Sequence, residues 1–429
     1  MELKKYKLGE ILDVTRGASL SGEFYATEGK YIRLTCGNFD YQNNCFKENK
    51  SKDNLYYIGD FKPEFLMEEG DIITPLTEQA IGLLGSTAII PESGKYIQSQ
   101  DVAKIICKEE LLDKDFVFYL ISSTLVKQQL SAAAQQTKIR HTSPDKIRDC
   151  TVWIPELTEQ KRIGKLLRSL DRKIELNRAI NQNLEAMAKQ LYDYWFVQFD
   201  FPNENGKPYK SSGGKMVWNE KLKREIPKGW NVLKLGEHCS FNKRTSNGYF
   251  NHPILYLDTS NITNNTIDEL QFLNPSSDII PSRARRLVQE GDIVYSTVRP
   301  NLKHFGIIMN PDYNMVVSTG FAVITANWSA YRYFIYQFLI QAATIENLST
   351  IAQSAVSAYP SINTSDIENL DLVVPPDSMI EKYAKTACRL YLQIDTNYKE
   401  IKSLTKQRDE LLPLLMNGQV SVNSDLFDD

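Results

Sequence analysis

The sequence predicts an α+β protein in which a mixed α/β domain occurs twice and each copy leads into a long helix. Two observations predict this fold. Short segments recur in the same order in both halves of the chain, which indicates an internal duplication. Two long stretches also place apolar residues at alternating steps of three and four, which is the spacing of a coiled coil.

The duplication is visible in three pairs of similar segments. They are KLGE at 7–10 and 234–237, EGDII at 69–73 with EGDIV at 290–294, and SPDKIRDCTVWIP at 143–155 with NTSDIENLDLVVP at 363–375. Each segment alone is a weak signal. Their common order and nearly constant separation indicate that one unit is written twice.

Each copy has the same internal plan. Strand-like runs such as 101–107 and 321–325 are separated by turns rich in Gly, Pro and Asn. Amphipathic stretches follow near 115–130 and 329–345, and a proline then precedes the long helix. This plan predicts a mixed α/β domain in each copy.

The two long helices are predicted from their apolar positions. The first seam comprises Ile163, Leu167, Leu170, Ile174, Leu184, Ala188, Leu191 and Trp195, and the second comprises Ile380, Ala384, Ala387, Tyr391, Ile394, Tyr398 and Ile401. Asn177 and Asn181 occupy seam positions of the first helix, where a polar residue fixes register and partner. Each helix could pack only against its own domain. Their length far exceeds the usual mean of about 11–12 residues, however, so pairing with each other is favoured.

These patterns define the expected domains. They are a mixed domain at 1–155, a long helix at 156–199, a linker at 200–229, a second mixed domain at 230–375, a second long helix at 376–418 and a tail at 419–429. The segment 200–229 is rich in Pro, Gly, Ser and Lys, so we expect a surface connector there. Pro413 is expected to loosen the last turn of the second helix, and Gly418 suits its end.

The composition is that of an ordinary globular protein. No apolar run reaches the roughly 18 residues of a membrane span and no signal-peptide core is present, so a cytoplasmic protein is expected. The six cysteines form no CxxC pair, and reduced thiols are expected. The net charge of −3 counts against a nucleic-acid binder, although local clustering of Lys and Arg decides that question.

A catalytic site is not evident in the sequence. Nucleotide-binding glycine loops and a nucleophile elbow are absent, and the four histidines are dispersed, so neither a metal site nor a cofactor is expected. The run 310–313, NPDY, resembles an adenine methyltransferase motif but lacks its second proline, and a turn is favoured. Asp145 and the 171–173 run imitate a nuclease pattern, but the latter lies in the long helix. We therefore expect a protein that is not an enzyme.

Basic residues cluster in the loops of both mixed domains, among Ser, Thr, Asn and Tyr. Such side chains bind phosphates and base edges, whereas a solvated surface charge is the alternative for each. The candidate DNA-binding residues are Arg16, Arg33, Gln79, Lys138, Arg140, Lys243, Arg244, Arg283, Arg285, Arg286, Arg299, Asn301 and Lys303. Arg299 precedes a proline directly after a strand-like run, and its repeat position in the first domain is Glu78. A pairing of Arg299 with a nearby carboxylate such as Asp292, which would only hold the loop, is the alternative to base reading.

Three segments carry a resemblance to a known family. The sequence at 159–202, at 283–308 and at 407–422 is similar to the specificity subunits of type I restriction–modification systems. The resemblance implies two target-recognition domains that each read half of a split, asymmetric DNA site. It also implies antiparallel pairing of the long helices as a ruler, with pseudo-twofold symmetry. The implied partners are double-stranded DNA, two methyltransferase subunits that carry S-adenosylmethionine, and two restriction–translocase subunits.

Two other functions remain open at this point. The chain could be a two-lobed coiled-coil scaffold for proteins, without nucleic acid, or a self-contained methyltransferase. The absence of a cofactor loop disfavours the methyltransferase. A scaffold would show no salt-dependent retention on DNA, whereas phosphate contacts require it.

Overall fold

The computed structural model describes residues 2–49, 53–78, 82–133, 140–354 and 360–423. The chain forms two compact units, unit 1 with residues 1–176 and 400–429 and unit 2 with residues 177–399. Two long helices, α5 (Leu157–Tyr192) and α9 (Asp377–Met416), each contribute to both units. The boundaries of the compact units therefore fall inside the long helices.

Unit 1 contains a mixed domain that precedes α5. Its helices are α1 (Leu8–Ile11), α2 (Lys114–Ile121), α3 (Thr124–Ala133) and α4 (Pro144–Arg148). Its strands are β1 (Lys4–Lys7), β2 (Leu12–Arg16), β3 (Tyr25–Ala26), β4 (Tyr31–Arg33), β5 (Phe39–Asp40), β6 (Cys45–Phe46), β7 (Tyr56–Tyr57), β8 (Ile72–Pro75), β9 (Thr77–Glu78), β10 (Ala88–Ile89), β11 (Tyr96–Ile97), β12 (Val102–Cys107), β13 (Arg140–His141) and β14 (Thr151–Ile154).

Unit 2 contains the corresponding domain that precedes α9. Its helices are α6 (Arg332–Leu339), α7 (Ala342–Ser354) and α8 (Thr364–Glu368). Its strands are β15 (Met216–Asn219), β16 (Arg224–Pro227), β17 (Asn231–Lys234), β18 (Cys239–Phe241), β19 (Ile254–Leu257), β20 (Ile262–Thr263), β21 (Thr266–Ile267), β22 (Gln271–Leu273), β23 (Ala284–Leu287), β24 (Ile293–Ser296), β25 (Phe305–Ile307), β26 (Met315–Ser318), β27 (Phe321–Ala326) and β28 (Asp371–Val374).

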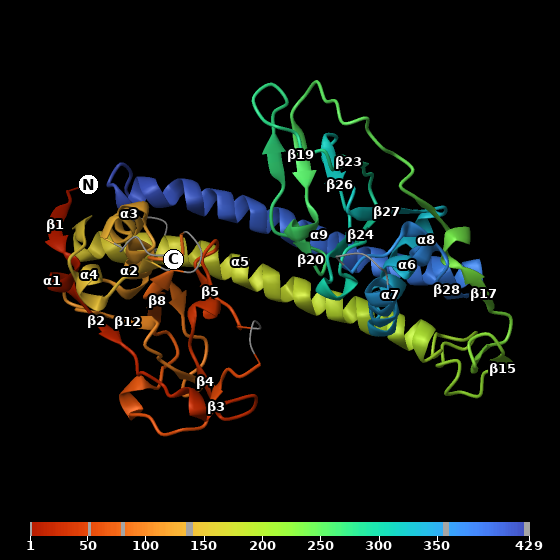
Figure 1. The fold of residues 1–429 in the computed structure, drawn as a ribbon, viewed down its shortest axis with the longest axis horizontal. Coiled ribbons are helices and arrows are strands. Elements are labelled where there is room, and N and C mark those ends of the chain that lie inside the picture. The colour runs from red at the N-terminus through yellow and green to blue at the C-terminus, as the bar shows by residue number, and fades with distance from the viewer. Residues whose placement is uncertain (1, 50–52, 79–81, 134–139, 355–359, 424–429) are drawn as a thin grey trace. The chain divides into compact units, whose positions relative to one another are not determined.

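The first sheets of the two units share one strand order, which confirms the expected duplication. In unit 1 one four-stranded sheet has the order β10-β8-β12-β2, and in unit 2 the matching sheet has the order β25-β24-β27-β18. A second sheet contains a parallel pair in each unit, β4 with β11 and β19 with β26. In each unit this second sheet stands farther from the long helices than the first (Figure 1).

The KLGE segments close each domain in the same way. Strand β1 pairs with β14 so that Lys7 faces Thr151, and β17 pairs with β28 so that Lys234 faces Asp371. The glutamate of each segment accepts a hydrogen bond from the backbone N–H of its lysine, at 2.7 Å and 2.8 Å. The motif therefore holds the start of each domain against its end.

The EGD segments form identical turns. Gly70 and Gly291 both have φ +83, a region that L side chains rarely adopt. The carboxylates of Asp71 and Asp292 each accept a hydrogen bond from the amide three residues earlier, at 2.9 Å and 2.8 Å. The glycine and the aspartate are therefore required by the turn itself.

The two amphipathic stretches are each broken into two helices. In unit 1 the break lies at Ser122–Ser123, between α2 and α3, and in unit 2 it lies at Ile340–Gln341, between α6 and α7. The hydroxyl of Ser122 bonds to the carbonyls of Phe118 and Tyr119, so it competes with continuation of the helix.

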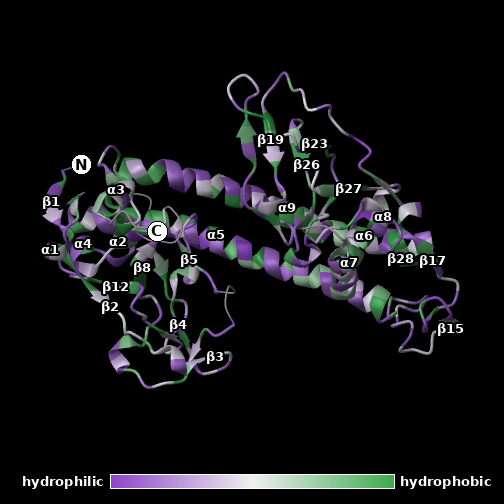
Figure 2. Ribbon diagram, in the orientation of Figure 1, coloured by the Kyte–Doolittle hydropathy of each residue, from purple (hydrophilic) through white to green (hydrophobic). Residues whose placement is uncertain are grey.

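The long helices pack against each other antiparallel within each unit, as the resemblance implied. In unit 1, Asp171 of α5 pairs with Arg408 of α9 at 2.9 Å. In unit 2, the amide of Asn397 donates to Asn181 Oδ1 at 2.8 Å. Both Asn177 and Asn181 are buried, which confirms them as seam residues. Polar and apolar residues alternate along both helices (Figure 2).

Part of the predicted seam is wrong. In α9, Tyr383 and Asn397 are buried at 0% and 4% exposure, whereas we expected their neighbours Ala384 and Tyr398 in these positions. The ring of Tyr383 packs at 4.9 Å from that of Phe196 in an aromatic cluster, which draws this face of the helix inward. The Tyr398 hydroxyl instead bonds to Thr266 at 2.8 Å, nearer the surface. Large side chains on neighbouring elements therefore decide which face is buried.

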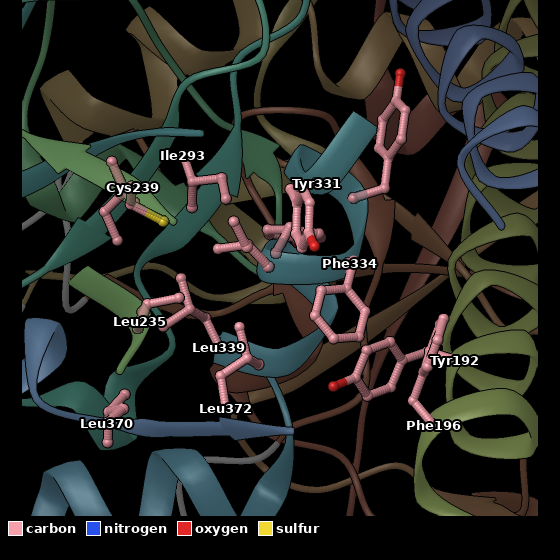
Figure 3. Packing of buried hydrophobic residues seen from close by; sticks show 14 of the residues in the cluster. Tyr192, Phe196, Leu235, Cys239, Ile293, Tyr331, Phe334, Leu339, Leu370 and Leu372 are labelled. Carbon is pink, nitrogen blue, oxygen red and sulfur yellow. The ribbon is translucent and has the colours of Figure 1, made fainter. Parts of the chain in front are cut away.

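The largest hydrophobic core lies in unit 2 and joins its sheet to both long helices. Tyr192, the last residue of α5, and Phe196, in the π-helical turn Asp193–Val197 that follows it, point toward Phe334 of α6 (Figure 3). The rings of Phe196 and Phe334 are 4.7 Å apart in an edge-to-face arrangement. Aromatic pairs of this kind add about 0.5–1.5 kcal/mol beyond the area they bury.

The segment 200–229 is more structured than a simple connector. Strands β15 and β16 form a hairpin in which Met216 faces Pro227. Phe201 is buried and stacks on both Tyr209 and Trp230. These aromatic contacts fold the segment back on itself, which its content of Pro, Gly and Ser did not predict.

At the C-terminal end of α9, the helix stop at Gly418 follows the sequence prediction. The helix continues through Pro413 to Met416, and the N–H groups of Gly418 and Gln419 bond to the carbonyls of Leu415 and Leu414. Gly418 has φ +70, as expected for a helix stop. Among the described residues, no helix combines the length and apolar content that a membrane crossing requires.

Candidate nucleic-acid interface

The loop after β24 in unit 2 has a backbone held in unusual conformations. Arg299 and Lys303 both adopt left-handed φ values, +47 and +59, on either side of a single turn of 3₁₀ helix at Pro300–Leu302. The N–H of Arg299 bonds to the carbonyl of Pro360 at 3.0 Å, and Thr297 bonds to Gly320 and Ile362. Non-glycine residues with positive φ persist only where the surrounding structure holds them, and they often mark functional sites.

The side chains of this loop face solvent. Arg299, Asn301 and Lys303 are all exposed. The loop borders a cavity of about 290 Å³ whose far wall comes from helix α7, through Ser349 and Gln353. The structure therefore brings a guanidinium, an amide and an ammonium group together on one rigid loop, as the sequence predicted.

The expected pairing of Arg299 with Asp292 is wrong. Asp292 is fully buried, and it accepts hydrogen bonds from Arg244 Nη2 and from the Thr325 hydroxyl, each at 2.6 Å. Arg244 also bonds to Gln289. These contacts assign Arg244 to the EGD turn of unit 2, and its side chain is turned toward the protein.

The basic run 283–286 is divided between solvent and protein. Arg283 is exposed, whereas Arg285 donates to the carbonyls of Ser282 and Asn247. Arg286 is partly buried, and burial lowers the pKa of its guanidinium. Lys243 is exposed, without a hydrogen bond or ion pair to the part of the chain that the structure describes. Arg283 and Lys243 are therefore available for phosphate contacts.

The candidates in unit 1 are held more tightly. Arg33 is 7% exposed, and its guanidinium lies 3.9 Å from the centre of the Tyr25 ring. Arg16 lies at the end of β2 and donates to the carbonyl of Gln100 at 2.8 Å. Arg140 lies in β13 and is half-buried beside Glu78. Gln79 and Lys138 lie outside the described residues.

A second cavity was not predicted, because its lining, within the residues that the structure describes, is mainly aromatic and apolar and holds no Lys or Arg side chain. It has a volume of about 340 Å³, lies on the second sheet of unit 2 and is lined by Phe250, His252, Tyr313 and other residues. Tyr313 and Tyr249 are 91% and 87% exposed. Tyr313 lines the cavity, and Tyr249 directly precedes Phe250, which also lines it. The aromatic pair Tyr249–Phe250 within a polar run was the available signal.

Metal ligation is not supported by the geometry. No group of three or more His, Cys, Asp or Glu side chains in the described ranges converges as a metal site would require. The run 310–313 forms a turn in which Asn310 has φ +47 and donates to Asp395 at 2.7 Å. The exposed basic and amide side chains on the loops of unit 2 are hydrogen-bond donors, and they are suited to binding an anionic polymer.

A family model for the type I restriction modification DNA specificity domain matches residues 1–186 and again residues 227–406. The type I restriction enzyme MjaIX specificity subunit of Methanocaldococcus jannaschii is 25% identical over 334 residues, which are 76% of this chain and 73% of that protein. The HindI specificity subunit of Haemophilus influenzae is 28% identical over 171 residues, 39% of this chain and 36% of that protein.

Among solved structures, the S subunit of a type I restriction–modification system from M. genitalium has the same fold. The two structures align with a TM-score of 0.56 at 16% sequence identity, and the alignment covers 97% of this chain and 96% of that one. The two matched ranges of the family model each contain one copy of the repeat and part of a long helix.

Proposed function

We propose that this chain, which belongs to the family of type I restriction–modification specificity subunits, reads a bipartite, asymmetric DNA site, one half with each mixed domain. We place these target-recognition domains at 1–155 and 230–375. The chain would work in the cytoplasm, where the DNA is, as a subunit without a catalytic centre of its own. Adenine methylation, with S-adenosylmethionine, and DNA cleavage would belong to its partner subunits.

One observation supports the bipartite reading above others. The two domains share the strand order of their first sheet and their EGD turns, yet the residues that follow the equivalent strands β8 and β24 differ in charge. Unit 1 has Glu78 at the position where unit 2 has Arg299. Two copies of one scaffold with different side chains at the same place are suited to reading two different sequences.

The long helices would separate the two domains and bind the modification subunits. Their outer faces carry apolar side chains that neither unit buries. Leu176, Met187 and Leu392 are 59%, 53% and 47% exposed, and Leu166 and Ile180 are half-buried. Apolar side chains in this number on polar helices favour a protein partner. We propose one methyltransferase subunit on each repeat and two restriction–translocase subunits in the full complex.

Exchange of one domain tests this function. Residues 1–155 are replaced by the first domain of another family member, and the methylated sites are mapped in a host that carries the modification subunits. We expect one half of the methylated site to change while the other half and the spacing stay as they were. The reciprocal exchange of 230–375 is the matched control. A change in both halves after either exchange contradicts independent reading.

A protein scaffold without nucleic acid is the second candidate, favoured by the same exposed apolar helix faces. The two functions differ in their response to salt. Each phosphate contact on duplex DNA lowers the logarithm of the affinity by about 0.9 per tenfold rise in salt. If the logarithm of the affinity of the complex for DNA falls linearly with the logarithm of the salt concentration, the result supports DNA binding. If the complex is not retained on DNA even at low salt, the result supports the scaffold.

A further inference from the structure

Strands β9 and β13 of unit 1 bring two opposite charges together at the position equivalent to Arg299. The strands pair antiparallel so that Glu78 faces Arg140. Arg140 Nη1 lies 3.6 Å from Glu78 Oε2. The Arg140 side chain is 38% exposed and that of Glu78 only 5%. The carboxylate therefore lies beneath the guanidinium, which remains accessible at the surface.

Glu78 is fixed in place by the loop that follows it. Its Oε1 accepts hydrogen bonds from the N–H groups of Gly82 at 2.8 Å and Leu84 at 3.5 Å. Its Oε2 is buried and has no hydrogen-bond partner within the described part of the chain. A buried carboxylate oxygen requires a nearby cation. Arg140 is the ion-pair partner that supplies this charge.

Arg140 is held from a second direction as well. Its Nη1 also donates to the hydroxyl of Ser131 in α3 at 3.0 Å. The strand that carries it is anchored by a bond from Thr142 N–H to the Leu76 carbonyl at 2.9 Å. A guanidinium has five N–H donors, so one edge held by Ser131 and Glu78 leaves donors for a ligand.

The equivalent bridge in unit 2 has the opposite arrangement. Val298 pairs with Ser361 as Thr77 pairs with His141 in unit 1. The neighbouring pair, which is equivalent to Glu78 with Arg140, is Arg299 with Pro360, and a backbone hydrogen bond joins these two residues. The guanidinium therefore comes from the first strand of the bridge in unit 2 and from the second strand in unit 1.

We propose that Glu78 is a positioning residue that aims Arg140 at a guanine in the half-site of the first domain, at the place that Arg299 occupies in the second. This proposal rests on the proposed function. Arginine reads guanine through two hydrogen bonds, to O6 and N7, and such reading requires a fixed guanidinium plane. Glu78 itself is buried and would not contact DNA.

The test uses the complex with its modification subunits, bound to its methylated site sequence and to every single-base variant of that site. Arg140→Ala should weaken binding to the cognate site by about 5- to 150-fold and abolish the preference at one base pair of the first half. Glu78→Gln keeps the size of the side chain and an acceptor for Gly82, and removes the charge. It should relax preference at that same base pair, by a smaller factor.

Two further variants separate positioning from a purely structural role. Arg299→Ala, the matched control, should change preference only in the other half-site. Glu78→Gln combined with Arg140→Ala should show no loss of preference beyond that of Arg140→Ala alone. If Glu78→Gln does not fold, Arg140→Lys replaces it, since an ammonium keeps the charge but loses the two-bond geometry and should relax the same base pair.

Two results would overturn the proposal. One is an unchanged base preference in Arg140→Ala, and the other is a Glu78→Gln variant with a lower melting temperature and intact preference. Neither result affects the proposed function, which in this experiment fails if the unaltered complex shows no preference for a split site. The unaltered complex is therefore measured first on the full set of variants.

Discussion

In unit 1 a buried ion pair joins the two long helices, whereas the equivalent layer of unit 2 is aromatic and apolar. Asp171 of α5 binds Arg408 of α9, and both side chains are 10% exposed. The repeat places Tyr391 and Ala188 at these positions in unit 2, both buried. The two domains thus reach the same helix pairing with different chemistry.

The same layer also binds each domain to its long helix. In unit 1 the hydroxyl of Tyr119 in α2 donates to Asp171 Oδ2 at 2.5 Å. In unit 2 the repeat position of Tyr119 is Gln337 in α6, whose amide donates to the Tyr391 hydroxyl at 2.8 Å. Burial, together with Asp171, raises the pKa of Tyr119 well above its usual range, so this phenol remains a donor. A single hydrogen bond is kept at this place while its partners change.

This comparison shows what the duplication preserves. The helix positions, the strand order of the first sheet and one hydrogen bond from the domain to its long helix recur in both units. The side chains at the equivalent positions of this layer differ. Each charged side chain in a buried site needs its oppositely charged partner, because an unpaired buried charge is costly. An aromatic layer needs only close packing of the rings and one hydrogen-bond partner for the buried hydroxyl. The two units should therefore respond differently to equivalent substitutions.

The largest effect is expected from Asp171→Ala. It removes the interhelical partner of the buried Arg408 guanidinium, which keeps Asp409 beside it, and it removes the acceptor of the Tyr119 hydroxyl. Loss of one member of a buried pair costs about 3–5 kcal/mol. The free energy of unfolding from denaturant titration of the full chain measures the loss. The double variant Asp171→Leu with Arg408→Met is the control and should regain most of the stability. A single-variant loss below about 1 kcal/mol would contradict a stabilising ion pair.

A pH-dependent effect is expected in unit 2 from Glu185. Burial raises the pKa of Glu185 in α5 to about 7 from the ordinary 4.5, although its hydrogen bond from Asn265 opposes the shift. The folded protein then holds this proton where the unfolded chain releases it. The contribution of Glu185 to stability is therefore greatest below pH 4.5 and falls as the pH rises toward 7.

We expect this fall to be on the order of 2–3 kcal/mol. The repeat position in unit 1 is Thr405, which has no such proton. The measurement is the unfolding free energy at pH 5 and pH 7.5 for the unaltered chain and for Glu185→Gln. In the variant, the unfolding free energy should no longer fall by this amount between pH 5 and pH 7.5. Equal slopes in both proteins would show that Glu185 has an ordinary pKa.

The smallest expected effect is a difference between two matched hydroxyl deletions. Tyr391→Phe removes a hydrogen bond between neutral groups and should cost about 0.5–1.5 kcal/mol. Tyr119→Phe removes a hydrogen bond to the Asp171 carboxylate and should cost about 1.5–3 kcal/mol. Denaturant titration of both variants measures the difference. If Tyr391→Phe loses more unfolding free energy than Tyr119→Phe, the stronger hydrogen bond lies in unit 2 and not in unit 1.

Much of the fold was predictable because its signals are local. The KLGE and EGD segments form a capped strand end and a turn from their own residues, so they recur wherever the backbone does. The strand-like runs were confirmed as β12 and β27. Helix periodicity depends on neighbours three and four positions away, so α5 and α9 were visible along the chain.

The candidate site was less predictable from the same information. The sequence pointed to Arg299 because a proline and a preceding strand are local features. It did not distinguish Arg244, which binds buried Asp292, from exposed Lys243 beside it. Neighbouring basic residues look alike in sequence, and their partners lie far away along the chain.

The sequence by itself determined the duplication, the long helices and the polar seam residues Asn177 and Asn181, because these depend on short-range periodicity and on repeated segments. The tertiary structure alone decided which faces were buried and which charges were paired. Tyr383 replaced Ala384 in the seam through its contact with Phe196. Glu78 became the partner of Arg140 through strands 62 residues apart. Such choices depend on the shape and charge that distant segments present to one another, and spacing along the chain carries no record of them.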